Sequence, residues 1–204
     1  MGKNGMKILC LYNNICAAEL FEWVRNQGHE TVCCTERLDR DWCREEKFDL
    51  AISYTYRYIL GEDILEALNN NAVNIHNSFL PWNRGADPNM WSIIEDTPRG
   101  VTLHYMDANL DKGYIIAQKM VGREEGETLK SSYEALDRAA KEMFREVFPF
   151  YARWPEMKKI PLGAGSYHSL KDGHQMKSVI DTYDMTTTEF KERVSNVLYQ
   201  SGRK

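Results

Sequence analysis

Three polar side chains of different chemical kinds lie at the edges of apolar runs in the middle of the chain. Asn74 and His76 alternate with Ile75, so they face the same side if this segment is a strand. Asp111 lies in a turn between two later strand-like runs, where the chain can bring it to the same face. An amide can donate to a developing oxyanion, an imidazole can manage a proton, and a carboxylate can set the charge of that imidazole. Together the three residue types predict the transfer of a small acyl group.

Each of these residues also has an ordinary structural explanation. Taken alone, His76 would be a hydrogen-bonded core histidine and Asn74 would close a turn. His104, inside another strand-like run, could help to hold Asp111 or could make a structural hydrogen bond only. The sequence does not separate a proton-accepting role of His76 from an oxyanion-donating role. No pair of histidines has the helical i, i+4 spacing, and we expect no metal site.

Length, charge and cysteine content exclude several classes of protein. With 204 residues, the chain fits one domain or one domain with a small appendage. A net charge of -4 and a pI near 5.8 argue against a nucleic-acid-binding protein. No apolar run approaches the ~20 residues of a membrane helix, and the N-terminus lacks the pattern of a signal peptide. The 5 cysteines include no C-x-x-C pair, so we expect a reduced, cytoplasmic protein.

The first half of the chain alternates strand-like and helix-like patterns. Short apolar runs predict strands, and apolar residues at helical spacing predict helices. The predicted strands are Ile8–Leu11, Thr31–Cys34, Asp49–Ser53 and Ala72–His76, and the predicted helices are Ala17–Asn26 and Glu62–Asn69. Repeated βα units imply an α/β fold, with a mostly parallel sheet flanked by helices and joined by right-handed crossovers. Such sheets bind ligands beyond the carboxyl ends of their strands, which is where His76 lies.

The second half has a different pattern. Two runs separated by a turn predict a β-hairpin, which makes the sheet locally mixed, and a long amphipathic helix should cover one sheet face. After Pro155 the pattern fragments, and we expect residues 1–154 to form one domain and residues 155–204 a small C-terminal appendage. The hairpin strands are Gly100–Met106 and Tyr114–Val121, the helices are Asp87–Glu95, Leu129–Tyr151 and Thr188–Leu198, and Ser178–Asp181 could be a further strand.

The polar residues belong to a longer pattern that resembles the folate-dependent formyltransferase family. It reads Asn-x-His-x-Ser-x-Leu-Pro from Asn74, then Arg-Gly, Pro-x-x-Trp, Gly-Val-Thr-x-His, Met-Asp, and Leu-Asp-x-Gly ending at Gly113. The resemblance covers roughly Lys7 to Val121. It implies a Rossmann-like catalytic domain, here residues 1–154, that takes a formyl group from N10-formyltetrahydrofolate. It also implies that Asn74, His76 and Asp111 are the catalytic residues.

Within that family, two flanking segments are most similar to the sugar N-formyltransferases, namely Tyr54–Ile59 and Leu80–Asn89. Glycinamide ribonucleotide transformylase holds a phosphate on a glycine-rich first loop, whereas the corresponding turn here, Tyr12–Cys16, has no glycine. The RNA-binding domain of methionyl-tRNA formyltransferase and the extra N-terminal domain of the deformylase are not expected here. We therefore expect N-formylation of the amine of a nucleotide-linked amino sugar.

The resemblance also assigns residues to the formyl donor. Tyr58, Ile59 and Leu60 correspond to the segment that borders the pterin, and Met106 and Asp107 would line its other side. These residues have ordinary explanations as well. The tyrosine could simply pack at a strand end, and Asp107 could be a turn residue.

The loop after the Asn-x-His segment would face the acceptor. Arg84 could meet a phosphate of a nucleotide sugar through paired donors, and Trp82 could stack on a base or a sugar. The ordinary alternative is a loop that is fixed by packing alone. The resemblance also suggests a homodimer.

Two other functions remain open from the sequence. Water could replace the amine, which would make the protein a formyltetrahydrofolate hydrolase. The chain could also be a folate- or nucleotide-binding module without turnover, although a mere binding module has no need of all three polar groups.

Overall fold

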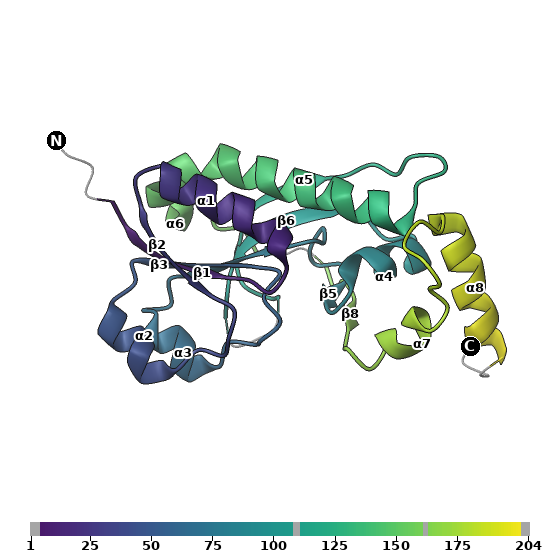
Figure 1. Cartoon of the computed structure of the whole chain (residues 1–204), viewed down its shortest axis with the longest axis horizontal. Coiled ribbons are helices and arrows are strands. Elements are labelled where there is room, and N and C mark those ends of the chain that lie inside the picture. The colour runs from purple at the N-terminus through teal and green to yellow at the C-terminus, as the bar shows by residue number, and fades with distance from the viewer. Residues whose placement is uncertain (1–4, 108–110, 161–162, 201–204) are drawn as a thin grey trace. The chain divides into compact units, whose positions relative to one another are not determined.

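The computed structural model describes residues 5–107, 111–160 and 163–200, with side chains up to residue 197 (Figure 1). The strands are β1 Lys7–Leu11, β2 Glu30–Cys34, β3 Leu50–Tyr54, β4 Ala72–His76, β5 Arg84–Gly85, β6 Gly100–Tyr105, β7 Ile115–Met120 and β8 Tyr167–His168. The helices are α1 Ala18–Asn26, α2 Arg40–Glu46, α3 Glu62–Ala67, α4 Pro88–Glu95, α5 Leu129–Val147, α6 Trp154–Met157, α7 Gly173–Lys177 and α8 Thr187–Gln200. Short 3-10 helices, η1 Ile15–Ala17 and η2 Phe148–Arg153, precede α1 and follow α5.

Six strands form one sheet in the order β2-β1-β3-β4-β6-β7. The strands β2, β1, β3 and β4 are parallel to their neighbours, and Ser53 is in register with Asn74. β6 runs antiparallel to β4. The backbone amide of Met106, just after the end of β6, donates to the carbonyl of Ala72 at the start of β4. β7 then returns antiparallel to β6, with the Tyr105 amide donating to Tyr114. The predicted α/β fold, with its mostly parallel sheet and mixed hairpin region, is confirmed.

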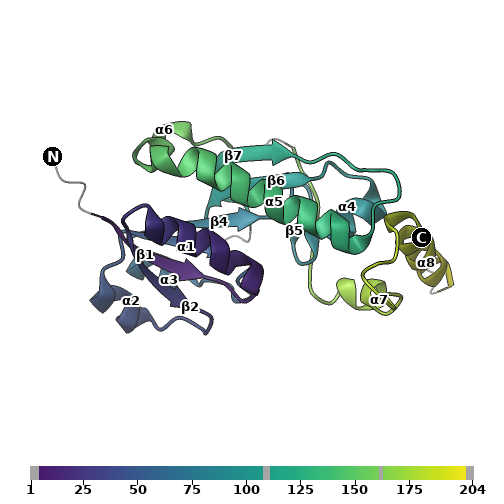
Figure 2. The ribbon, with the colours of Figure 1, turned by 45° about the horizontal axis from the view of Figure 1, so that its top comes forward.

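The chain forms two compact units that are interleaved along the sequence. The first comprises Met1–His76, Leu103–Ala117 and Val147–Pro161. In this unit α1 lies on one face of β1–β3, whereas α2 and α3 lie on the other (Figure 1 and Figure 2). The apolar cluster under α2 and α3 contains Leu9, Leu11, Cys43, Phe48, Ala51, Leu60, Ile64, Leu65, Ala67, Leu68 and Ala72. We refer to it below as the α2/α3 cluster.

The second unit comprises Asn77–Thr102, Gln118–Glu146 and Leu162–Lys204. Its apolar cluster joins α4, α8 and the start of α5 through Ile93, Leu129, Met176, Met185, Phe190 and Val194. A buried polar network lies in the same unit. The Arg99 guanidinium donates at 2.7 Å to both the Glu127 carboxylate and the Ser132 hydroxyl, and Ser132 donates to Asn89. This network fixes the start of β6 against the start of α5.

Two predicted elements differ in the structure. The helix expected to reach Tyr151 ends as an α-helix at Val147, because Pro149 has no amide hydrogen to continue it. Residues 178–181 do not form the expected strand. Val179 and Ile180 pack instead against the apolar cluster of the second unit, and the Val179 carbonyl accepts from Arg193 of α8. The expected domain boundary between residues 154 and 155 stays a prediction.

Within the described part of the chain, no helix is long and apolar enough to cross a membrane. In the same residues, no group of three or more histidine, cysteine, aspartate or glutamate side chains could hold a metal ion.

Removing one partner of the Arg99–Glu127 pair should destabilise the fold strongly, because the two residues are only 3% and 7% exposed. Replacing Arg99 with alanine leaves an unpaired buried carboxylate, so we expect the free energy of unfolding to fall by about 3–5 kcal/mol. Urea denaturation followed by circular dichroism measures this change. A matched control is Lys119→Ala, which breaks the exposed 2.9 Å pair with Glu142 and should cost less than about 1 kcal/mol. Equal losses in the two variants would contradict the assigned importance of the Arg99 network.

Candidate active site

Asn74 is the middle residue of β4 and His76 is its last, so their side chains lie on the same face of the sheet. Ala72 shares that face by its spacing and belongs to the α2/α3 cluster. Asn74 is half-buried, whereas His76 is 8% exposed. β4 lies between β3 and β6 in the sheet, so both side chains are held by a strand with neighbours on both edges.

Asp111 reaches these residues from the loop between β6 and β7. Its Oδ2 atom lies 3.7 Å from Nε2 of His76, and its Oδ1 atom lies 3.5 Å from Nε2 of His104. The carboxylate is buried, and the residue has a left-handed backbone conformation with φ of 52°. The convergence of Asp111 and His76 that the sequence suggested therefore occurs in this structure.

Gly113 allows the loop to close against β6. A Cβ atom at this position would lie 1.7 Å from the carbonyl oxygen of Tyr105, which no side chain can tolerate without a backbone shift. The Tyr105 amide also donates to the carbonyl of Tyr114 at 2.9 Å. The lack of a side chain at Gly113 therefore sets how close this part of the chain, two residues after Asp111, comes to β6.

His104 completes the cluster from β6. Its Nδ1 atom lies 2.9 Å from the carbonyl oxygen of Tyr105, and a carbonyl can only accept, so Nδ1 carries a hydrogen. In the neutral ring, Nε2 then accepts from the Asn74 amide nitrogen, 3.3 Å away. The rings of His76 and His104 meet edge to face, with centroids 6.3 Å apart. His104 therefore lies beside Asp111 and also makes a structural hydrogen bond, and its part in holding Asp111 stays a prediction.

The cluster brings one amide, two imidazoles and one carboxylate together in a largely buried place. The carboxylate lies within 4 Å of both imidazoles, so it can stabilise a positive charge on either ring. The amide nitrogen of Asn74 carries two hydrogens, and His104 accepts only one of them. The arrangement can therefore donate a hydrogen bond, accept a proton and stabilise the charge that results.

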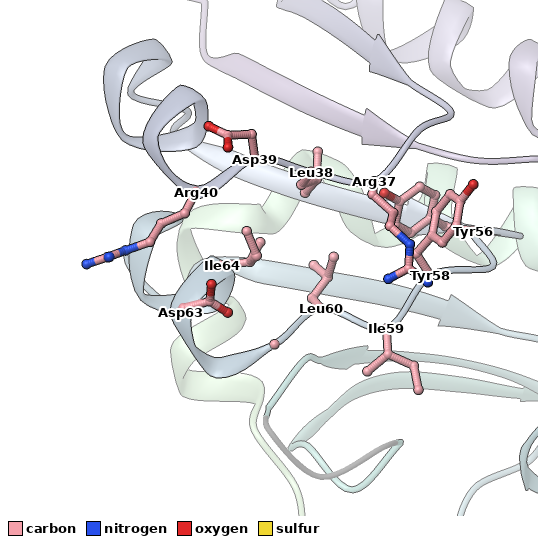
Figure 3. Close-up of a pocket in the computed structure, with 11 residues that line it drawn as sticks. Arg37, Leu38, Asp39, Arg40, Tyr56, Tyr58, Ile59, Leu60, Asp63 and Ile64 are labelled. Carbon is pink, nitrogen blue, oxygen red and sulfur yellow. The ribbon is translucent and has the colours of Figure 1, made fainter.

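A cavity of about 370 Å³ lies next to the donor segment predicted from the sequence (Figure 3). Its apolar centre is formed by Leu38, Leu60 and Ile64, and the tyrosines Tyr56 and Tyr58 lie at one end. The predicted residues Tyr58, Ile59 and Leu60 all line this cavity. Leu60 is buried, whereas Ile59 is 71% exposed and presents its side chain to a ligand or to solvent.

The two tyrosines are held in different ways. Burial raises the pKa of the Tyr56 phenol to about 12, and the protonated hydroxyl donates to the carbonyl of Glu36. Tyr58 accepts at 2.7 Å from the Arg57 guanidinium, and the guanidinium carbons of Arg37 and Arg57 lie 4.8 and 4.9 Å from its ring centroid. The wall of the cavity at this end is thus aromatic and flanked by positive charge.

The other predicted donor residues lie where β6 ends. Met106 packs against the α2/α3 cluster, which also contains Leu60, so the structure brings these two residues to one apolar region. Asp107 is exposed. Residues 108–110, which follow Met106 and Asp107 in the chain, lie outside the described residues.

The predicted acceptor residues Trp82 and Arg84 belong to the second unit. Trp82 is 37% exposed. Arg84 forms β5 with Gly85, and its guanidinium donates at 3.3 Å to the carbonyls of Ala164 and Ser166. The guanidinium therefore ties β5 to the C-terminal segment, and its role toward an acceptor stays a prediction.

An α/β sheet that holds a half-buried amide together with two buried imidazoles and a buried carboxylate has the groups that a group-transfer reaction needs. Comparison with known families gives a specific result. The family described as formyl transferase matches residues 30–148, which is more than half of the chain. The chain belongs to the formyl transferase family, and the resemblance stated from the sequence is confirmed.

Three known proteins show how this chain relates to the family. The formyltransferase PseJ from Anoxybacillus kamchatkensis, solved with UDP-4,6-dideoxy-4-formamido-L-AltNAc and tetrahydrofolate, is 36% identical. That match has a TM-score of 0.82 and covers 92% of this chain and 99% of that chain. A 4-N formyltransferase from Francisella tularensis shares the fold, with 22% identity, a TM-score of 0.75, and coverage of 93% of this chain and 87% of that chain.

The methionyl-tRNA formyltransferase of Myxococcus xanthus is 39% identical over 114 residues. The match covers 55% of this chain and only 36% of that protein, so the chain spans well under two thirds of this relative's length.

Gly113 gives a direct test of how Asp111 is placed. We expect Gly113→Ala to lower formyl transfer by at least about 100-fold, because the loop must move away from β6 and take the carboxylate with it. Stability should fall by about 1–3 kcal/mol, as is usual for overpacking. Steady-state kinetics and thermal unfolding measure the two effects.

The control is Gly122→Ala, since a Cβ atom at that glycine would meet no other atom within 4 Å. It should leave both activity and stability near the wild-type values. A Gly113→Ala variant with wild-type turnover would contradict the assigned role of the close approach.

Proposed function

We propose that this protein is an N-formyltransferase that moves a formyl group from N10-formyltetrahydrofolate to the amine of a nucleotide-linked amino sugar. The observation that carries the proposal is the largely buried cluster of Asn74, His76, His104 and Asp111. Its residue types and separations suit attack by an amine on a formyl carbon, and the family to which the chain belongs supports the same chemistry.

In this proposal each side chain has a defined task. As the amine attacks the formyl carbon, negative charge develops on the formyl oxygen, and the second hydrogen of the Asn74 amide donates to it. His76 accepts the proton that the amine loses, and Asp111 stabilises the imidazolium. The new carbon–nitrogen bond forms while the bond between the formyl carbon and N10 breaks, and the proton passes to N10. His104 holds the amide of Asn74 and the carboxylate of Asp111 in place.

We place the formyl donor beside Tyr58, Ile59, Leu60 and Met106. The cavity there has an apolar centre, as an aromatic ring system requires, and the relative PseJ was solved with tetrahydrofolate. Asn74 and His76 project from the same sheet face as the α2/α3 cluster, which contains Leu60. A donor bound against this cluster would therefore lie on the face that carries the catalytic side chains.

For the acceptor, we propose a nucleoside-diphosphate sugar with a free amine. The support is the relative PseJ, whose bound sugar is a UDP-linked 4-formamido compound, together with 36% identity over nearly the whole of both chains. Arg84 and Trp82 remain the proposed contacts to the nucleotide part. A homodimeric state and a cytoplasmic location belong to the same proposal.

Variants of the catalytic residues test the proposed mechanism. We expect His76→Ala and Asp111→Asn each to lower kcat by about 10²- to 10⁴-fold without unfolding the protein. His174→Ala, which removes an exposed imidazole from α7, is the matched control and should retain wild-type turnover. If His76 accepts the proton, added imidazole should restore part of the activity of His76→Ala. Near wild-type turnover in either variant would contradict the assignment.

The overall reaction is tested by mass spectrometry with N10-formyltetrahydrofolate and a panel of nucleotide-linked amino sugars. The first acceptor to try is the UDP-linked 4-amino sugar that would give the compound bound to PseJ. The expected result is the mass gain of one formyl group in place of one hydrogen on a single acceptor. Formate release that is independent of any acceptor would instead identify a hydrolase. Tight folate binding without transfer or release would identify a binding module.

A further inference from the structure

Thr55, the first residue after β3, has an unusual backbone conformation. Its φ angle is 62°, in the left-handed region. The other non-glycine residues with positive φ in the described ranges are asparagines, aspartates and a lysine, so Thr55 is the one β-branched residue among them. A β-branched side chain is poorly tolerated in this region, and such a conformation persists only where the surroundings hold it.

The turn after β1 supplies the groups that hold Thr55. The backbone amide of Asn13 donates to the Thr55 carbonyl at 3.2 Å. The backbone amide of Asn14 donates to the Thr55 hydroxyl at 3.2 Å. The Asn13 side chain makes two further bonds. Its Oδ1 atom accepts from the Arg57 amide at 2.9 Å, and its Nδ2 atom donates at 2.7 Å to the carbonyl of Thr35, which follows β2.

The position of Asn13 in the sheet explains why one side chain can do this. β1 lies between β2 and β3, so the residue that follows β1 can reach the carboxyl ends of both neighbours. Asn13 uses both of its polar atoms for that purpose, although the side chain as a whole is exposed. The bond to the Arg57 amide is made immediately before Tyr58, Ile59 and Leu60, the residues that line the cavity (Figure 3).

We propose that Asn13 is a positioning residue for the formyl donor, acting through the left-handed turn at Thr55 that directs residues 56–60 along the cavity. The inference rests on the proposed function, because the cavity is assigned to the folate. It goes beyond that function by assigning a role to the turn after β1, which has no glycine and makes no contact that the proposed chemistry requires.

Three variants separate this role from a simple contribution to folding. Asn13→Ala removes the acceptor for the Arg57 amide, and we expect the Kd for tetrahydrofolate and the KM for the formyl donor to rise about tenfold. The kcat at saturating donor should stay within about threefold of the wild-type value. Asn13→Asp keeps the acceptor for the Arg57 amide but loses the donor to the Thr35 carbonyl, so its affinity for tetrahydrofolate should lie between those of Asn13→Ala and the wild type. Asn13→Ala combined with Thr55→Gly should recover most of the lost affinity, because glycine adopts the left-handed conformation without support.

Isothermal titration with tetrahydrofolate measures affinity, and hydrogen exchange of the peptide containing residues 55–60 reports on the segment without any ligand. We expect faster exchange in Asn13→Ala than in the wild type and in Asn26→Ala. The latter is a control that removes an exposed asparagine from the end of α1. The control should also bind tetrahydrofolate with unchanged affinity.

The outcomes distinguish the inference from the proposed function. Wild-type protein that binds no tetrahydrofolate overturns the proposed function and this inference together. If the wild type binds tetrahydrofolate and Asn13→Ala binds it equally well, only the inference is overturned. The inference is also overturned if Asn13→Ala loses affinity and kcat together, and if neither Asn13→Asp nor the double variant Asn13→Ala/Thr55→Gly binds better than Asn13→Ala. The effect would then be one of folding.

Discussion

The reversal of strand direction between β4 and β6 is the constraint on which the candidate site depends. If β6 were parallel to β4, different residues of the two strands would be neighbours. The loop after β6 would then begin level with the end of β4 instead of its start. Because β6 is antiparallel, His104 near the end of β6 lies beside Asn74 in the middle of β4. The chain leaves β6 level with the start of β4, whereas Asp111 lies 3.7 Å from His76 at the end of β4. Gly113, two residues after Asp111, lies directly against the Tyr105 carbonyl, which leaves no space for a side chain there.

The same geometry decides what the cluster can do chemically. One carboxylate lies within 4 Å of both imidazoles, so it can stabilise positive charge that develops on either ring during a reaction. The hydrogen bond from Nδ1 of His104 to a backbone carbonyl fixes the tautomer of that ring, and this in turn orients the amide of Asn74. Catalytic groups that are held in this way need no rearrangement when charge develops on a substrate.

Much of this could be predicted from the sequence because the signals are local. Alternation places Asn74 and His76 on one face of a strand, and short apolar runs locate the parallel strands to within one or two residues. Other features depend on partners far along the chain. The role of His104 requires the antiparallel pairing of β6 with β4. The segment 178–181 has the composition of a strand. Val179 and Ile180 nevertheless pack against the apolar cluster of the second unit instead of pairing with a strand. The left-handed turn at Thr55 has no sequence signature, since its support comes from Asn13 and Asn14, more than 40 residues earlier.

The structural role of Arg84 is compatible with the binding role proposed for it. A guanidinium has five N–H donors in a fixed plane, and the carbonyls of Ala164 and Ser166 accept from two of its nitrogens. These bonds hold the plane of the group still, so the remaining donors keep a fixed direction. A fixed plane suits the paired recognition of a phosphate better than a mobile side chain would. In the proposed role, the segment around residues 164–166 would therefore contribute to acceptor binding indirectly, by setting the orientation of Arg84 rather than by touching the nucleotide.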